Sequence, residues 1–190
     1  MKMIQLAKQL WHKMMIGMAI TTLCVMAPFY TSAYTPAFAQ STSETSSEPE
    51  STHKDWAAHT HGKGGEKQCF ITSTPKQLKG EYDRSNRGPT RIYVTHRNGS
   101  RNEISTYAGY RYRDQSEVIF KIDGKTYKLY IDGNYAWAYE NDASKMIAAM
   151  RRGKNLTVTG ISSRGNKTID IYSLSGFTAA YKAINALCPK

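Results

Sequence analysis

The sequence of 190 residues has few of the side chains on which most enzymes and metal sites depend. It contains three cysteines and five histidines, and no histidine follows His96. No segment carries the glycine-rich signature of a phosphate-binding loop or a dinucleotide-binding turn. No serine stands in the G-x-S-x-G pattern of a nucleophile elbow. These absences argue against nucleotide-dependent and serine-hydrolase chemistry, and they favour a protein that is not an enzyme and needs no cofactor.

Long apolar runs are also missing, except near the start of the chain. Residues 14–29 are uncharged and mostly apolar, and three lysines precede them. Ala37 and Ala39 then place small residues three and one positions before a potential cleavage point, which is the layout of a secretory signal peptide over residues 1–39. The apolar run is shorter than the roughly 20 residues that a membrane span needs. An uncleaved N-terminal anchor is the alternative.

The next segment, residues 40–55, contains four acids and no aliphatic or aromatic side chain that could be buried. We therefore expect a disordered acidic tether there. The rest of the chain, residues 56–190, is long enough for one domain with one core. It holds 22 basic and 11 acidic residues. This excess of positive charge favours anionic partners such as lipid headgroups or lipopolysaccharide, or it only keeps the domain soluble. Nucleic acid is not expected for an exported chain.

Alternating apolar residues and turn signals predict antiparallel strands through the domain. Two Asp-Gly pairs, at 123–124 and 132–133, divide three such strands into a meander. A tight Asn98-Gly99 turn precedes another predicted strand. The predicted strands are 91–96, 103–113 with a break at 108–109, 117–122, 125–131, 134–139, 155–163 and 167–174. The expected fold is a mainly β, antiparallel, sandwich- or barrel-like single domain with one short internal helix and a C-terminal helix.

The two helices are predicted from apolar residues at helical spacing. The first covers residues 143–152, and Asp142 is expected to cap it. The second begins near Ser175 and runs almost to the end of the chain. Its apolar face comprises Phe177, Ala180, Tyr181, Ile184 and Cys188. Cys188 should therefore face the interior of the domain.

The cysteines admit three interpretations. Cys24 lies inside the signal peptide and is lost with it, which leaves Cys69 and Cys188. An even number of cysteines in an exported protein favours a disulfide bond between them. A catalytic thiol would need a nearby base, and the C-terminal half of the chain has no histidine. A metal site would need more ligands close to either cysteine.

Arginines mixed with tyrosines are the strongest functional indication in the sequence. Arg111 and Arg113 should share one face of their segment, which leaves Tyr110 and Tyr112 facing the core. Guanidinium groups suit phosphates and other anions because they donate several hydrogen bonds in a fixed plane. The candidate anion-binding residues are Arg91, Arg97, Arg111, Arg113 and Arg164. The alternative is a solvated charged face.

Histidines supply a weaker candidate. His59 and His61 are two residues apart and would share a face on a strand, so they could bind a metal, with His53 or another nearby group as a third ligand. A metal-dependent or enzymatic periplasmic factor using this pair is our alternative function. The glycines that follow favour the other interpretation, in which these histidines are solvated surface residues and no metal binds.

An ordered set of short motifs resembles the invasion-associated locus B (IalB) family. The C-terminal matches are Ala136-Trp137, Ala149-Met150 with Gly153, Ser163-Arg164-Gly165, Asp170-x-Tyr172-Ser173-Leu174, Gly176-Phe177, Ala179-Ala180 and Cys188. The upstream matches are Asp55-Trp56, Cys69, Ser73-x-Pro75, Val94-Thr95-x-Arg97 and Gly109-Tyr110. The resemblance covers roughly residues 55–188, and the ordered set is more specific than any single motif.

This resemblance implies a compact, mainly β domain with a C-terminal helix, made with a signal peptide. It also implies a periplasmic, secreted or outer-membrane-associated protein of the cell envelope, with a role in host-cell interaction in pathogenic members. The partners would be anionic lipid, lipopolysaccharide, or a protein of the envelope or host. It supplies no catalytic residues that could be assigned to this chain.

Overall fold

A computed structural model describes residues 49–189 of the chain. The predicted signal peptide, its cleavage site and residues 40–48 of the predicted tether lie outside this range. The buried apolar side chains of the described part all lie between Trp56 and Ile184, and they form a single core. Residues 56–188 therefore contain both the core and the disulfide bond described below.

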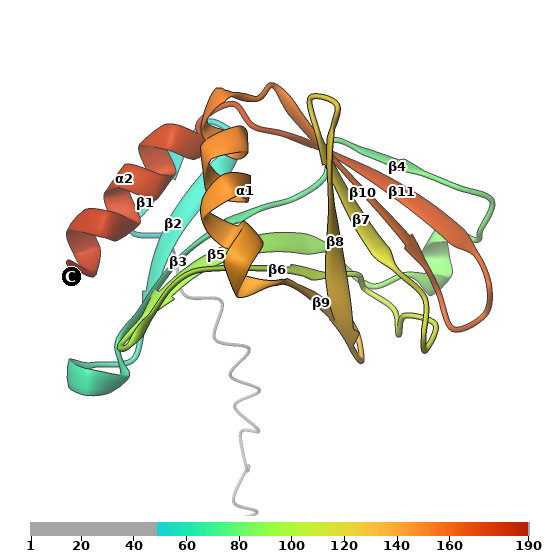
Figure 1. The fold of residues 1–190 in the computed structure, drawn as a ribbon, viewed down its shortest axis with the longest axis horizontal. Helices are drawn as coiled ribbons and strands as arrows, with labels where there is room; N and C mark the ends of the chain where they lie inside the picture. The colour runs from blue at the N-terminus through green and yellow to red at the C-terminus, as the bar shows by residue number, and fades with distance from the viewer. Residues whose placement is uncertain (1–48, 190) are drawn as a thin grey trace, which may run out of the picture. The chain divides into compact units, whose positions relative to one another are not determined.

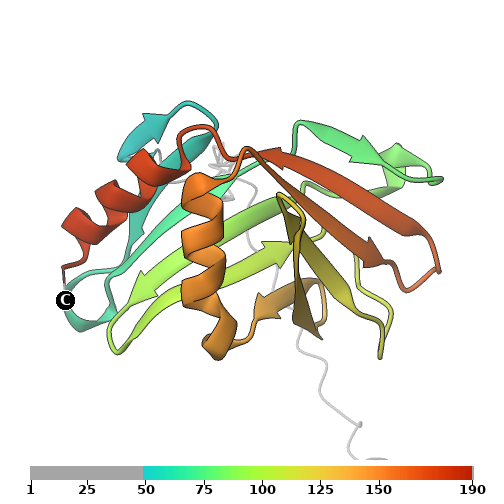
Figure 2. The ribbon, with the colours of Figure 1, turned by 45° about the horizontal axis from the view of Figure 1, so that its top comes forward.

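Eleven strands form one antiparallel sheet in the described residues (Figure 1). Their order across the sheet is β1-β2-β3-β5-β6-β9-β8-β7-β10-β11-β4. The bounds are β1 Ser51–His53, β2 Trp56–His61, β3 Gln68–Ser73, β4 Gln77–Lys79, β5 Arg91–Arg97, β6 Ser100–Tyr107, β7 Val118–Ile122, β8 Lys125–Asp132, β9 Tyr135–Ala138, β10 Asn155–Ile161 and β11 Lys167–Ser173. The sheet curls strongly, as Figure 2 shows, so that it resembles half of a barrel. Of the two forms expected from the sequence, the barrel-like one is correct, and there is no second sheet to make a sandwich in this part of the chain.

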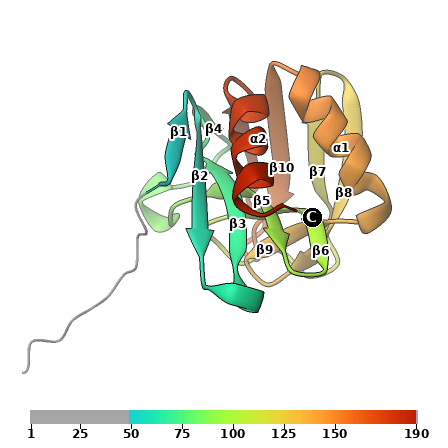
Figure 3. The same ribbon diagram turned by 90° about the vertical axis from the view of Figure 1, so that its left-hand side faces the viewer.

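Two α-helices lie inside the curve of the sheet (Figure 3). They are α1, Glu140–Arg152, and α2, Phe177–Leu187. Trp56 of β2 meets Phe177 edge to face, with 5.0 Å between the ring centroids. Met146 and Met150 of α1 are completely buried in the same core. The sheet thus has an inner face covered by helices and an outer face turned away from them.

The mainly β fold with two helices is confirmed, and so are most of its predicted elements. The meander predicted from the Asp-Gly pairs is β7-β8-β9, and β10 pairs with β11 along its whole length. Asn98 and Gly99 form the turn between β5 and β6, where Arg97 faces Ser100. Asp123 and Gly124 both adopt positive φ, as this kind of tight turn requires.

Four strands were not predicted. β1, β2, β3 and β4 are short, and several of their residues are polar. β1 lies inside the segment predicted to be a disordered tether. It pairs with β2, and the N–H of Glu50 donates to the carbonyl of Ala58. The tether prediction is therefore wrong for its last residues, because the backbone of a polar segment can add to the edge of an existing sheet without burying side chains.

The predicted N-caps of both helices are wrong. α1 begins at Glu140, so Asp142 lies in its first turn and caps nothing, and Tyr139 occupies the N-cap without a side-chain hydrogen bond. In α2 the N-cap is Gly176, with a left-handed φ of 94°, in place of Ser175. Within residues 49–189, neither helix is long and apolar enough to cross a membrane.

Candidate anion-binding cleft

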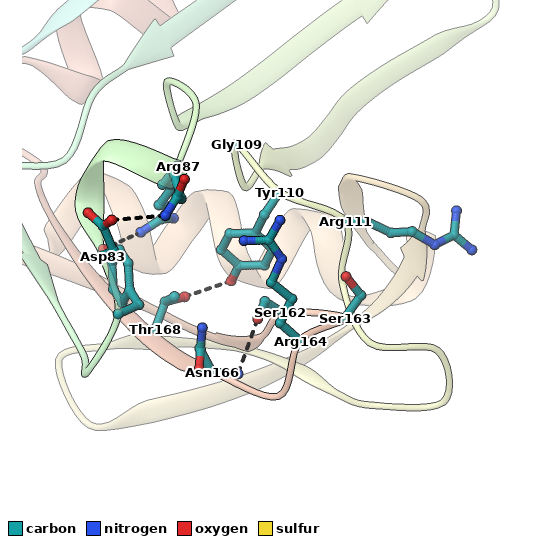
Figure 4. A pocket seen from close by; sticks show the side chains of 12 residues that line it. Asp83, Arg87, Gly109, Tyr110, Arg111, Ser162, Ser163, Arg164, Asn166 and Thr168 are labelled. Carbon is teal, nitrogen blue, oxygen red and sulfur yellow. Dashed lines mark hydrogen bonds between the residues drawn. The ribbon is translucent and has the colours of Figure 1, made fainter.

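A cleft of about 300 Å³ opens beside the β10–β11 turn (Figure 4). The segment after β6 and the loop between β4 and β5 form its other walls. Its lining residues are Tyr82, Asp83, Asn86, Arg87, Gly109, Tyr110, Arg111, Ser162, Ser163, Arg164, Asn166 and Thr168. Most of these carry guanidinium, hydroxyl or amide groups, so the cleft offers many hydrogen-bond donors.

Backbone pairing sets the direction of the arginines at the cleft. The N–H of Arg113 donates to the carbonyl of Ile161 at 2.8 Å, and the N–H of Ser163 donates to the carbonyl of Arg111 at 2.8 Å. Tyr112 forms an antiparallel bridge with Ser162 between these two bonds. Successive side chains of an extended segment point to opposite sides. Tyr112 is therefore buried, with 1% of its surface exposed, while Arg111 and Arg113 point outwards.

A buried ion pair fixes one wall of the cleft. Arg87 donates from Nη1 to Oδ1 of Asp170 at 2.7 Å and from Nη2 to Oδ2 at 2.6 Å. Both side chains are only 4% exposed. Arg87 also donates from Nε to the carbonyl of Ala108 and from Nη1 to the hydroxyl of Tyr82, each at 2.9 Å. This set of bonds replaces the water that the buried charges have lost.

The charge of Arg87 is held in place by its surroundings. Burial disfavours the charged form, but the carboxylate of Asp170 outweighs burial and raises the pKa of Arg87 above its ordinary value. The guanidinium also lies 5.0 Å from the ring centroid of Tyr110 and 5.6 Å from that of Tyr82, within the range of cation–π attraction. Arg87 is therefore a fixed part of the wall, whose charge Asp170 already neutralises.

Tyr110 links the segment after β6 to β11, the strand that also carries Asp170. Its hydroxyl lies 2.6 Å from Oγ1 of Thr168, and burial raises the pKa of Tyr110. Space for its ring comes from Gly160 of β10. A Cβ atom there would lie 3.0 Å from the Tyr110 hydroxyl and 2.6 Å from the ring of Tyr112. A glycine inside an otherwise regular strand thus makes room for two tyrosines.

The segment after β6 approaches the loop before β5 unusually closely. Gly109 has a φ of +73°, and a Cβ atom on it would lie 2.1 Å from the carbonyl oxygen of Gly88. The N–H of Gly88 donates to the carbonyl of Gly109 at 3.0 Å. Only glycine fits at this contact, which fixes where Tyr110 and Arg111 leave the sheet.

Two of the five predicted anion-binding arginines, Arg111 and Arg164, line the cleft. Arg164 lies in the β10–β11 turn and extends across the cleft in the view of Figure 4. Arg113 lies against the same turn, because a Cβ atom on Gly165 would be 2.7 Å from its Nη2. Arg111 pairs with Asp114 at 3.2 Å, but both side chains are well exposed, so the pair contributes little. The guanidinium groups of Arg113 and Arg164 form no hydrogen bond or ion pair with any described residue.

The other two predicted arginines lie elsewhere. Arg91 begins β5 and Arg97 ends it, so the length of the strand separates them. Arg97 is paired with Glu103 at 2.5 Å. The five candidate arginines therefore do not all lie in one place, because the length of β5 separates Arg91 from Arg97.

The structure places His59 and His61 on β2 and His96 on β5. His59 and His61 share one side of β2, and the ring of His59 stacks on Phe70 at 5.0 Å. Among residues 49–189, no three His, Cys, Asp or Glu side chains come together as a metal site. His96 is completely buried, and burial lowers its pKa. Its Nδ1 accepts from the N–H of Asn102.

The two cysteines of the domain are bonded to each other, as predicted. Cys69 of β3 and Cys188, just after α2, form a disulfide bond with 6.0 Å between their Cα atoms. Arg101 donates to the carbonyl of Cys188 at 2.8 Å and Lys67 to that of Leu187 at 2.9 Å. These cations satisfy carbonyls at the negative end of the helix.

Arg87 and Asp170 were not among the site residues predicted from the sequence. A usable signal was present: Asp170 occupies an inward position of an alternating strand, between Thr168 and Tyr172. A carboxylate in such a position needs a buried partner. Nothing in the sequence identified Arg87 as that partner, since it lies in a loop 83 residues earlier.

Together these features define a small, disulfide-bonded β domain with two inner helices and an arginine-bearing cleft at one end of a hairpin. The family model described as invasion associated locus B (IalB) protein matches residues 56–185. The chain belongs to this family.

A solved structure supports the fold. The crystal structure of invasion associated protein B from Bartonella henselae is similar, with a TM-score of 0.52 and 19% sequence identity. The match covers 72% of this chain and 95% of that one. No curated protein matches the chain. At this identity, the structural similarity describes the fold alone.

Proposed function

We propose that this chain is an exported, non-catalytic protein of the cell envelope that binds an anionic group in the cleft. One observation carries the proposal: Arg164 lines the cleft, Arg113 lies against the same β10–β11 turn, and both guanidinium groups are unpaired among the described residues. An anion placed there would receive charge-assisted hydrogen bonds. The neutralised pair of Arg87 and Asp170 would keep the wall rigid behind it.

A binding role suits the chemistry of the lining better than a catalytic one. The carboxylate of Asp83 is occupied, since it accepts hydrogen bonds from Ser85 and Asn86. The side-chain and backbone hydrogen bonds from Ser85 lower the pKa of Asp83, so this carboxylate stays ionised rather than moving a proton near neutral pH. Burial raises the pKa of Tyr110, whose hydroxyl is bonded to Thr168, so the phenol stays protonated near neutral pH and is not available as a base.

An exported location is part of the proposal. The first 39 residues have the composition of a signal peptide. The disulfide bond between Cys69 and Cys188 is of the kind that persists in oxidising compartments. Anionic groups available in the periplasm or at the outer membrane include phospholipid headgroups and the phosphates of lipopolysaccharide.

We expect purified residues 40–190 to bind vesicles containing phosphatidylglycerol, and also lipopolysaccharide, in a salt-sensitive way. Binding should weaken strongly between about 0.05 M and about 1 M salt, because the screening length falls to about 3 Å. Arg113→Ala with Arg164→Ala should reduce it at low salt. Sedimentation with vesicles measures this directly.

The matched control is Arg151→Ala with Arg152→Ala, which removes the same charge from the exposed end of α1. If both double variants lose binding equally, the attraction comes from net charge and the cleft is not the site. Competition by free phosphate would separate recognition of the phosphate group from recognition of the lipid surface. Binding that ignores salt would contradict the proposal.

A further inference from the structure

The outer face of the sheet carries a group of aromatic side chains that the helices leave uncovered. The three large apolar side chains most exposed in the described residues are Tyr130 (46%), Tyr135 (38%) and Tyr139 (51%). All three lie on or next to β8 and β9. Both helices pack on the inner face of the sheet (Figure 3). A cluster of exposed rings of this kind marks an interaction surface more often than chance exposure does.

Strand register arranges these side chains in two adjacent rows. The first row, across β5, β6, β9 and β8, is Arg91, Tyr107, Tyr135 and Asp132. The second row, across the same strands, is Tyr93, Ser105, Trp137 and Tyr130. Their chain neighbours, such as Ile92, Ile104, Ala136 and Leu129, are buried in the core. We call the five rings Tyr93, Tyr107, Tyr130, Tyr135 and Trp137 the aromatic face.

The rings contact one another across the strands. The centroids of Tyr107 and Tyr135 are 5.0 Å apart, and those of Tyr135 and Trp137 are 5.8 Å apart with their planes at 29°. Ser105, between Tyr93 and Trp137, is only 4% exposed although it faces outwards. Neighbouring rings therefore cover the small residue and make a continuous platform.

The charges at the ends of the first row decide which ligand fits. Arg91 stands at one end and Asp132 at the other. Neither the guanidinium of Arg91 nor the carboxylate of Asp132 forms an ion pair or hydrogen bond with a described residue. The positive charge of Arg91 and the negative charge of Asp132 cancel, so the row has no net charge. It therefore favours neither an anion nor an anionic membrane. A neutral ligand rich in hydroxyl groups could satisfy both ends.

We propose that the aromatic face binds a neutral glycan laid across β5, β6, β9 and β8. The C–H faces of sugar rings, slightly positive, would stack on the negative faces of the tyrosine and tryptophan rings. Arg91 would donate to sugar oxygens, and Asp132 would accept from sugar hydroxyls. With strands about 4.8 Å apart, the row spans roughly 14 Å, the length of a short oligosaccharide.

This surface shares no side chain with the cleft, so the two proposals can be tested independently. Trp137 provides a built-in reporter. In residues 40–190 the other tryptophan, Trp56, is 1% exposed and donates its indole N–H to the carbonyl of Ser173. A fluorescence change on adding sugar would therefore report on Trp137.

The test is a printed array of neutral glucans, galactans, mannans and N-acetylglucosamine oligomers, followed by fluorescence titration with the best binder. We expect saturable binding that is unaffected by salt and about tenfold weaker in Tyr135→Ala. Asp132→Asn should also weaken it. Arg151→Ala with Arg152→Ala, at the exposed end of α1 and outside both rows, should leave it unchanged.

Several outcomes would overturn the proposal. These are the absence of any bound neutral glycan, an equal loss in Tyr135→Ala and in Arg151→Ala with Arg152→Ala, or binding restricted to anionic glycans. A change in Trp137 fluorescence with phosphatidylcholine vesicles, without glycan binding, would instead make the surface a membrane contact. A dimer in solution that Tyr135→Ala dissociates, again without glycan binding, would make it a contact between copies of this chain.

Discussion

Asp170 shows how one residue determines the candidate site. Among the described residues it is the only carboxylate with almost no exposed surface, at 3%. β11 turns it inward because every second side chain of that strand faces the core. Its two oxygens hold the guanidinium of Arg87, and Arg87 in turn meets the rings of Tyr82 and Tyr110. The position of the cleft wall therefore depends on this carboxylate.

Replacing Asp170 by Ala should destabilise the domain by about 3–5 kcal/mol, because Arg87 would keep a buried charge without its partner. Urea denaturation of the oxidised protein measures the change. Arg87→Met with Asp170→Leu should cost less than Asp170→Ala alone, since it removes both charges. The control is Arg111→Ala with Asp114→Ala, an exposed pair that should contribute less than about 1 kcal/mol. If both pairs lost the same free energy of unfolding, burial would not determine how much an ion pair contributes to stability in this domain.

At the scale of elements, the start of α2 is joined to the N-terminal hairpin. A Cβ atom on Gly176 would lie 1.8 Å from the carbonyl oxygen of His53. The N–H of Asp55 donates to the carbonyl of Ser175 at 3.3 Å. Gly176 thus serves two needs, a left-handed backbone and contact with the β1–β2 turn without a side chain.

Gly176→Ala should lower the free energy of unfolding by at least about 2 kcal/mol, since it combines backbone strain with a steric clash. Gly124→Ala is the matched control. Gly124 has a similar positive φ of +89° but nothing within 4 Å of the added Cβ, so only the backbone cost of about 1 kcal/mol should remain. Thermal unfolding followed by circular dichroism compares them. The same loss in both variants would show that the contact with His53 is unimportant.

The strands that could be predicted were those with local signals. β7, β8 and β9 carry alternating apolar residues and tight-turn pairs, which act over a few residues. β1 and β4 have three residues each and depend on neighbours distant in sequence, so no local pattern reveals them. The site divides in the same way. The outward direction of Arg111 and Arg113 could be predicted from the alternation of side chains along the segment. The placement of Arg87 and Arg164 near them depends on tertiary packing.

For the domain as a whole, the bond between Cys69 and Cys188 closes a loop across a sequence separation of 119 residues. It joins the third strand to the end of the last helix. In the chain-entropy description, closing a loop of this length restricts the unfolded chain by roughly 4–5 kcal/mol. The bond therefore contributes more to stability than any single hydrogen bond described above.

A thiol assay on unreduced residues 40–190 should find no free cysteine. Cys69→Ala with Cys188→Ala should shift the urea midpoint downwards by an amount equivalent to roughly 4–5 kcal/mol, or less if the unfolded chain retains structure. Two free thiols in the unreduced protein would contradict the bond. An unchanged midpoint in the double variant would contradict its stabilising role.

The contact between Trp56 and Phe177 also determines when the domain can fold. A ribosome makes the chain from its N-terminus, so β2 is complete long before α2 exists. Until Phe177 and Ile184 arrive, the core side of the first strands has nothing to cover it. Pairing between such distant segments is slow compared with local structure. We therefore expect the domain to fold after synthesis rather than during it, so that the chain remains unfolded while it is being made.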